Sequence, residues 1–323
     1  MMLLIVLLPL RAAAQTPHVV IVVGLSGDAE HAELFKKWGD TLAAAAVSKL
    51  GVSRDHLAYL ADQPVEDKRV TGRSTREEVV RALHAVASSA GADDPVMIVL
   101  IGHGTFDGRA AKFNLRGPDM TAEEFAPLLD KIRSKRLVFV NTASASGPFV
   151  EALSGEGRTI ITATRTGAER FATLFGGFFV DAIATDAADA DRNGRVSMLE
   201  AFAYSTRAVT DAYAREGLMM TEHALLDDNG DKEGSTEPSI DAKDGRVASV
   251  IALGSATAAV PADANPRLRA LYAERQALEH RVESLKLLKG SMDPARYASQ
   301  LEQLLTDLAL KSREIREAEG KSR

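Results

Sequence analysis

The sequence predicts an α/β protein with a doubly wound, mostly parallel sheet flanked by helices, followed by a C-terminal antiparallel helical hairpin. Two observations lead to this prediction. Short apolar runs rich in β-branched residues alternate with amphipathic stretches from about residue 18 to residue 253, which is typical of consecutive strand–helix–strand units. Beyond a proline-bearing break, apolar residues recur at helical spacing in two further runs, which indicates two helices.

The first half of the α/β pattern contains two strands and two helices. Residues 18–23 form a continuous β-branched run, of the kind that is buried on both faces of a parallel sheet. A helix is predicted over residues 32–50. A second helix begins after Thr75, whose spacing from Glu78 fits a capping box, and it leads into a strand at 96–101.

The second half repeats this order. Another capping-box signature, Thr121 with Glu124, precedes a helix and then a strand over residues 137–141. Two later strands are predicted over residues 159–163 and 247–253. In sheets of this kind, functional sites lie beyond the carboxyl ends of the strands, so functional residues are expected in the loops that follow the strands.

The predicted C-terminal hairpin has coiled-coil-like spacing, with a turn at Gly290 to Pro294 between its helices. We expect it either to brace the main domain or to offer a surface for a partner or for self-association. The chain as a whole therefore divides into four segments: a signal-like stretch (1–14), the α/β domain (17–254), a linker (255–266) and the helical hairpin (267–318).

The first fourteen residues have the plan of a secretory signal. An apolar stretch over residues 1–10 precedes Ala12 to Ala14, which predicts cleavage after Ala14 and export to the periplasm or the medium. The stretch is short and no basic residue precedes it. The alternative is a buried first strand, which Pro9 and Arg11 interrupt. Only about half of the roughly 20 apolar residues of a membrane span are present, so no span is expected.

The composition excludes several classes of function. The chain has 39 lysines and arginines against 45 aspartates and glutamates, a formal net charge of −6, and no basic block, so no nucleic-acid partner is expected. It contains no cysteine. Disulfides, thiolate metal sites and lipid attachment through cysteine are therefore excluded.

Two strand ends carry the residues with the strongest catalytic character. One apolar strand leads into Gly102-His103-Gly104, and the next ends in Ala143-Ser144-Ala145-Ser146-Gly147. Parallel strands present their carboxyl ends at one edge of a sheet, so we expect His103 and Ser144 to share a pocket. For His103 alone, a loop histidine without a catalytic role is the alternative.

These motifs resemble those of the caspase/legumain superfamily of cysteine peptidases, in which one strand ends in His-Gly and the next in Ala-Cys-x-Ser-Gly. Ser144 stands in the place of the cysteine. The resemblance covers roughly residues 19–253 and is to a bacterial branch with legumain-like features. It implies a caspase-like sheet, a histidine at position 103 that assists the nucleophile, and a peptide or protein ligand. It also implies specificity built by the loop that contains Arg165.

Serine at the nucleophile position changes the expected chemistry. A thiol has a pKa of about 8.5 and readily forms a thiolate, whereas a serine hydroxyl needs a closely bonded base that a third group orients. Thr142 breaks the Gly-x-Ser-x-Gly pattern of many serine hydrolases. The candidates for orienting His103 are Asn141, Asp107 and Asp28.

We therefore expect a catalytically impaired pseudopeptidase that binds peptide or protein, with His103 and Ser144 as a vestigial or weak pair. The backbone of Gly102, Gly104 and Gly147 is a candidate for an anion-holding turn in the pocket. Two alternatives stay open. One is an active hydrolase that uses Ser144 with His103, and the other is a calcium-braced scaffold that acts through the hairpin.

Residues 189–200 fit the twelve-residue EF-hand calcium loop position by position. Gly194 stands at the sharp turn, and helix-like stretches flank the loop. Because the loop lacks the paired partner of calcium sensors, we expect a structural Ca²⁺ rather than a signalling switch. An acidic turn without calcium is the alternative. The expected ligands are Asp189, Asp191, Asn193, Arg195 through its carbonyl, Ser197 and Glu200.

A second acidic run extends from Asp227 to Asp231. It lacks a following helix and a distal glutamate. We expect an exposed turn there, with a second oxygen cluster for a cation as the alternative.

Overall fold

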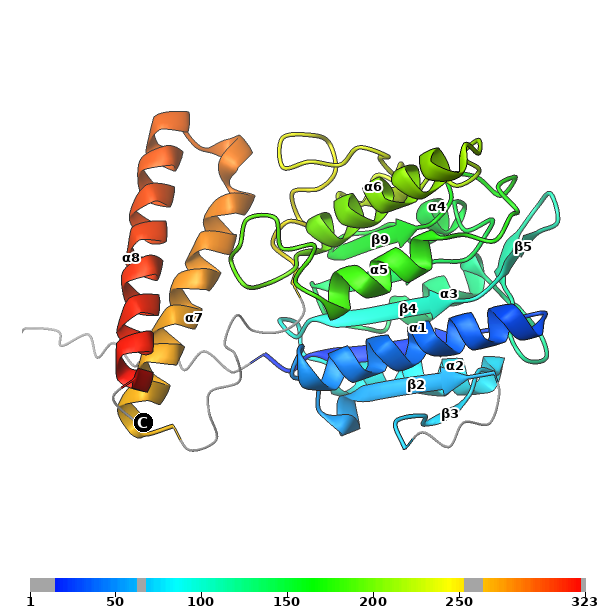
Figure 1. Cartoon of the computed structure of the whole chain (residues 1–323), viewed down its shortest axis with the longest axis horizontal. Coiled ribbons are helices and arrows are strands. Elements are labelled where there is room, and N and C mark those ends of the chain that lie inside the picture. The colour runs from blue at the N-terminus through cyan, green and yellow to red at the C-terminus, as the bar shows by residue number, and fades with distance from the viewer. Residues whose placement is uncertain (1–14, 63–67, 253–263, 321–323) are drawn as a thin grey trace, which may run out of the picture.

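A seven-stranded sheet forms the centre of the molecule in the computed structural model, which describes residues 15–62, 68–252 and 264–320 (Figure 1). Its strand order is β10-β9-β8-β4-β1-β2-β3, and every neighbouring pair is parallel except β10 with β9. The predicted α/β class is therefore confirmed. The strands are β1 (His18–Val23), β2 (Leu57–Ala61), β3 (Gly72–Arg73), β4 (Val96–Ile101), β8 (Leu137–Asn141), β9 (Arg158–Thr162) and β10 (Leu225–Asp227).

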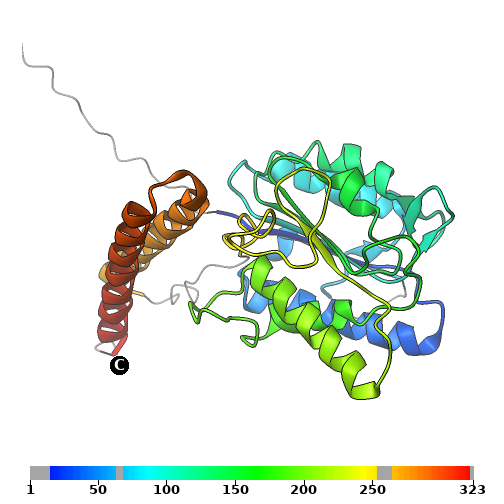
Figure 2. The same ribbon diagram turned by 90° about the horizontal axis from the view of Figure 1, so that it is seen from above.

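Helices cover both faces of this sheet, and the side chains of β1 show why both faces must be covered (Figure 2). Val19 and Ile21 enter one apolar cluster, whereas Val20 and Val22 enter the other, and all four are fully buried. The first cluster contains α1 (Ala29–Ser48), α5 (Phe175–Ala184) and α6 (Met198–Glu216). The second contains α2 (Arg76–Ser89), α3 (Ala122–Leu129) and α4 (Phe149–Leu153).

Side-chain caps set where several helices begin. Asp28 accepts a hydrogen bond from His31 N (2.8 Å), so α1 starts three residues before the predicted position. Thr121 and Glu124 form the complete predicted capping box at α3. At α2, Thr75 accepts from Glu78 N at 3.4 Å, which is one half of the predicted box.

A small antiparallel sheet extends from the carboxyl end of β4. It consists of β5 (Gly104–Phe106), β6 (Ala111–Phe113) and β7 (Met120–Thr121). Because β5 begins one residue after His103, this sheet fixes the course of the chain next to the candidate catalytic histidine.

The prediction of a strand over residues 247–253 was wrong within the described residues. Residues 246–250 form turns, and Ala252 makes a single bridge to Ser197. The cause is the buried Asp228 carboxylate, which accepts hydrogen bonds from Gly245 N (2.9 Å) and Ala248 N (2.7 Å) and winds this segment. The sheet ends instead in β10.

The C-terminal hairpin is confirmed as α7 (Pro266–Leu287) and α8 (Pro294–Gly320), joined by a short 3-10 turn, Lys289–Ser291. It lies at the end of the sheet opposite β5 (Figure 1). The predicted signal-like segment and most of the predicted linker fall outside the described residues. None of the helices in the described part of the chain is both long and apolar enough to span a membrane.

Candidate functional site

The two candidate catalytic residues emerge side by side at the carboxyl edge of the sheet. Strands β4 and β8 are hydrogen-bonded neighbours in parallel register, with Leu100 opposite Asn141. His103 follows the end of β4 by two residues, and Ser144 follows the end of β8 by three. The topology therefore brings together the two segments that the sequence singled out.

The His103 imidazole faces the start of α1. Its ring lies 4.7 Å from the ring of His31 and 5.0 Å from that of Phe35, and its Nε2 is 3.0 Å from Ser26 O. Burial lowers the pKa of His103, and the neighbouring His31 lowers it further. The ring is therefore neutral near pH 7, which is the form that can accept a proton.

The Ser144 hydroxyl is held by the backbone of Gly104. Its Oγ accepts a hydrogen bond from Gly104 N (3.3 Å) and donates one to Gly104 O (3.1 Å), and only 4% of the residue is exposed. Within the described residues, no hydrogen bond joins Ser144 to His103. The next residue, Ala145, has a φ of 55°, a left-handed conformation that is uncommon for a residue other than glycine.

The three candidates for orienting His103 have other partners. Asn141 Oδ1 accepts from Ala143 N (3.0 Å), and Asp107 forms an ion pair with Lys112 (2.9 Å). The carboxylate of Asp28 pairs with Nδ1 of His31 (2.8 Å), the residue whose ring touches His103. Asp28 is therefore bonded to His31. Burial lowers the pKa of the His103 imidazole, and the negative charge of Asp28 raises it by a smaller amount.

The predicted pocket glycines allow close packing. A Cβ on Gly104 would lie 2.2 Å from Ser144 O, and one on Gly147 would lie 2.3 Å from Arg165 O. At Gly102 the nearest neighbour, at 3.2 Å, is the ring of Phe113. The N–H groups of Gly104 and Gly147 already donate to Ser144 Oγ and Thr164 Oγ1, so they are engaged within the protein.

The loop after β9 carries Arg165 and a residue that the sequence did not single out, Glu169. The Arg165 side chain is exposed, while its backbone N–H donates to Glu169 Oε2 (2.9 Å). Glu169 also pairs with His223 Nδ1 (2.9 Å), and its carbonyl accepts from Ala145 N (2.7 Å). Glu169 therefore ties the Ser144 loop to the Arg165 loop and to the segment before β10.

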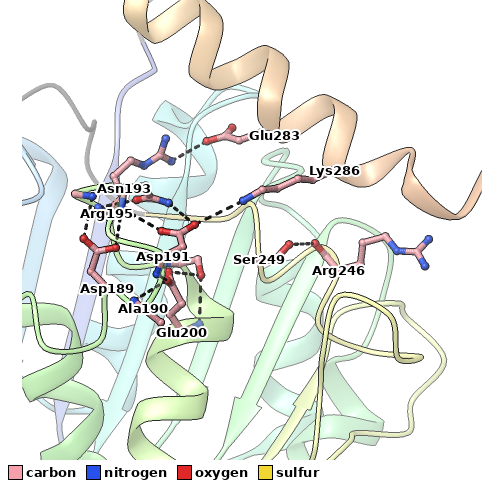
Figure 3. A network of polar contacts seen from close by, with 12 residues as sticks. Asp189, Ala190, Asp191, Asn193, Arg195, Glu200, Arg246, Ser249, Glu283 and Lys286 are labelled. Carbon is pink, nitrogen blue, oxygen red and sulfur yellow. Dashed lines mark hydrogen bonds and ion pairs between the residues drawn. The ribbon is translucent and has the colours of Figure 1, made fainter. Parts of the chain in front are cut away.

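The predicted calcium loop lies between α5 and α6, next to the hairpin (Figure 3). One carboxylate oxygen each from Asp189, Asp191 and Glu200 lies within 4.8 Å of the others. Gly194 adopts the left-handed conformation with φ 82° and donates its N–H to Asp189 Oδ2 (2.9 Å). The three strongest oxygen donors of the motif therefore converge, as a hard cation requires.

The remaining predicted ligands complete the same turn. Asn193 Oδ1 accepts from Arg195 N (2.9 Å), and Ser197 Oγ and Glu200 Oε2 are 2.7 Å apart within the capping box of α6. Burial raises the pKa of Asp191, and the charge of Glu200 raises it further. The loop thus concentrates negative charge, which Lys286 compensates in part and a bound cation would compensate further. Its oxygen donors fit Ca²⁺.

Two side chains of α7 contact this loop. The Glu283 carboxylate is 2.8 Å from Arg195 Nη2, and Lys286 Nζ is 3.9 Å from Asp191 Oδ2 (Figure 3). The same Glu283 carboxylate is 3.3 Å from Arg136 Nη2. The hairpin is therefore attached to the α/β part of the molecule at the candidate metal site.

The prediction of an exposed turn at Asp227 to Asp231 was wrong for its first two residues. Asp227 is 1% exposed and Asp228 is 6% exposed, because Asp227 belongs to β10 and Asp228 caps the turn at 245–248. Asp231 is exposed and pairs with Lys243 (2.6 Å).

Comparison with known proteins agrees with this fold. The model of the peptidase C13 family, a legumain/caspase-like family, matches residues 70–219. The match includes β4, β8, His103, Ser144 and the calcium-type loop. No curated protein matches the chain. The family match and the mostly parallel sheet together indicate a caspase/legumain-like peptidase fold.

Proposed function

We propose that this protein is an exported, catalytically impaired relative of the C13 peptidases that binds a peptide or protein at the carboxyl edge of its sheet. The observation that carries this proposal is the bonding of Ser144. Its hydroxyl is engaged on both sides by the backbone of Gly104 instead of by the imidazole of His103. With no cysteine in the chain, no thiolate is available in its place.

The chemistry of the serine hydroxyl supports an impaired site. To attack a carbonyl, Ser144 Oγ must lose its hydrogen bond to Gly104 O and transfer its proton to a base within hydrogen-bonding distance. Nε2 of His103 is directed to Ser26 O, and the carboxylate of Asp28 is bonded to His31. A serine nucleophile normally needs the base and its orienting group in direct contact, so the pair lacks two of the required hydrogen bonds.

The alternative is an active hydrolase that uses Ser144 with His103, and one observation favours it. The left-handed φ of Ala145 places a strained turn directly after Ser144, and strained turns present the nucleophile in many hydrolases. The neutral imidazole of His103 could serve as the base after a side-chain rotation.

A peptidase assay with an active-site probe separates these proposals. We expect no cleavage of asparaginyl, aspartyl or arginyl peptides and no labelling by a fluorophosphonate. Ser144→Cys is expected to give a trace of cleavage, because a thiolate forms more readily than an alkoxide. Robust wild-type cleavage that both Ser144→Ala and His103→Ala abolish would establish the active hydrolase instead.

We further propose that the 189–200 loop binds a structural Ca²⁺ that braces α5 and α6. In a third proposal for the function, this brace also presents the hairpin to a partner. The contacts of Arg195 with Glu283 and of Asp191 with Lys286 support that arrangement, because they join the loop to α7. Deleting residues 264–323 and comparing protein capture with the full chain tests it, and unchanged capture would exclude the scaffold role.

Export is tested on protein from the native host. We expect N-terminal sequencing to find a mature chain that begins near Gln15. An intact Met1 on the protein from the soluble cytoplasmic fraction would contradict export.

A further inference from the structure

The outer face of α8 is an exposed stripe with an unusual order of residues. The opposite face of the helix packs against α7 through the buried Leu304 and Ile315. On the two flanks of the outer face, Leu305 is 47% exposed and Leu310 is 45% exposed, along an open groove of about 820 Å³. The stripe includes Glu302, Leu305, Thr306, Ala309, Leu310 and Arg313.

The stripe is self-complementary about its midpoint, which lies between Asp307 and Leu308. Reading outward from that point, Thr306 mirrors Ala309 and Leu305 mirrors Leu310. The last pair of the series is Glu302 and Arg313, which carry opposite charges.

We propose that two copies of the chain associate by antiparallel packing of α8 against α8 across a two-fold axis at this midpoint. In that arrangement each Glu302 meets the Arg313 of the second copy along the centre of the interface. The leucines flank this centre, with Leu305 near the second copy's Leu305 on one edge and Leu310 near the second copy's Leu310 on the other. A two-fold interface uses the same patch on both subunits, and this stripe has the symmetry that such an interface requires. The small side chains of Thr306 and Ala309 at the centre let the two helices approach closely.

The charges select this orientation. Parallel, in-register packing would place Glu302 against Glu302 and Arg313 against Arg313, and like charges in contact oppose association. Within one copy, Arg313 Nε is 3.7 Å from Glu317 Oε1, a long and exposed pair that contributes little. No ion pair of the Glu302 carboxylate is found in the described residues, so both charges can pair across the axis.

The position of the stripe leaves it accessible. The ion pairs that join the hairpin to the α/β part come from α7 and the turn after it, through Glu283, Lys286 and Lys289. Figure 1 shows α8 on the far side of α7 from the sheet. The proposed interface involves only α8, so dimerisation is independent of the chemistry at Ser144 and of calcium binding.

The predicted dimer is weak. Two leucines and a few small residues from each copy bury much less than the roughly 1,600 Å² of a standard interface, so we expect a weak, reversible dimer. Sedimentation velocity of the full chain over a range of concentrations measures it. We expect a monomer–dimer equilibrium for wild type.

Charge reversal at the two ends of the stripe tests the register. Glu302→Arg and Arg313→Glu are each expected to weaken dimerisation about tenfold or more, because each change places like charges together twice in the dimer. The double variant restores opposite charges and is expected to dimerise within about threefold of wild type. Arg281→Glu makes the same charge change at an exposed position on α7 and is the matched control, expected to leave the equilibrium unchanged.

Circular dichroism confirms that each variant keeps its helices, so that unfolding is not mistaken for dissociation. A chain that stays monomeric at every concentration would overturn the proposal. So would a dimer that the single reversals do not weaken, or one that the double variant does not restore.

Discussion

Calcium is expected to stabilise the wild-type chain, and chelation is expected to remove that stabilisation. Asp189, Asp191 and Glu200 bring three carboxylates together, so without a cation they repel one another and the anchor between α5 and α6 weakens. A ligand that binds only the folded state adds about 2.7 kcal/mol at a hundredfold excess over its dissociation constant. Thermal unfolding with calcium and with chelator measures the difference directly.

Glu200→Gln tests whether the loop is the cause. Glu200 occupies the last position of the motif, where a bidentate carboxylate completes the calcium shell, so the variant is expected to lose most of the gain. Glu216→Gln makes the same change at an exposed position at the far end of α6 and is expected to behave as wild type. Equal wild-type midpoints in the two conditions, with no heat of calcium binding by calorimetry, would mean that the loop is an acidic turn.

The sequence predicted where the site lies better than how its atoms are bonded. The strands before His103 and Ser144 are continuous apolar runs, and parallel pairing of such runs brings their carboxyl ends together. The contact between Ser144 and Gly104 depends on the close approach of two loops, which no local pattern encodes. Glu169 escaped notice for the same reason, since its partners Ala145 and His223 are distant in the sequence.

Two errors in the predicted strands have a similar cause. Residues 247–252 have the composition of a strand, but the carboxylate of Asp228, about twenty residues earlier, decides their conformation. Strand β2 escaped prediction because its sequence, Leu-Ala-Tyr-Leu-Ala, lacks the β-branched residues that marked the predicted strands. Short elements are specified by their neighbours in the sheet more than by their own pattern.

Two further carboxyl groups are buried near Asp228: that of Asp227, in β10, and that of Asp244, directly before the turn at 245–248. Asp227 and Asp244 are each 1% exposed, and within the described residues Oδ2 of each lacks a hydrogen-bond partner. The other oxygen of Asp244 accepts from Asp228 N at 3.4 Å. Burial, together with the charges of Asp228, Asp227 and Asp231, raises the pKa of Asp244 to about 6, against the opposing effect of the hydrogen bond from Asp228 N.

Replacing Asp244 with asparagine is therefore expected to stabilise the protein above pH 6. Between the ordinary pKa of 3.8 and about 6, the folded chain binds a proton at Asp244 that the unfolded chain does not. The wild-type free energy of unfolding therefore falls as the pH rises through this window, and the loss is complete above it. The shift corresponds to about 3 kcal/mol, since one pKa unit is about 1.4 kcal/mol.

Asparagine keeps an oxygen for Asp228 N and carries no charge, so the Asp244→Asn variant is expected to lack that slope. Chemical denaturation from pH 4 to pH 8 should give similar stabilities for the two proteins near pH 4 and a gap that widens to pH 7. The control, Asp211→Asn, changes an exposed aspartate on α6 and is expected to follow wild type throughout. A variant that is less stable than wild type at pH 7.5, or that keeps the wild-type slope between pH 4 and pH 6, would show that the ionised Asp244 carboxylate is stabilised by a partner, such as a bound cation.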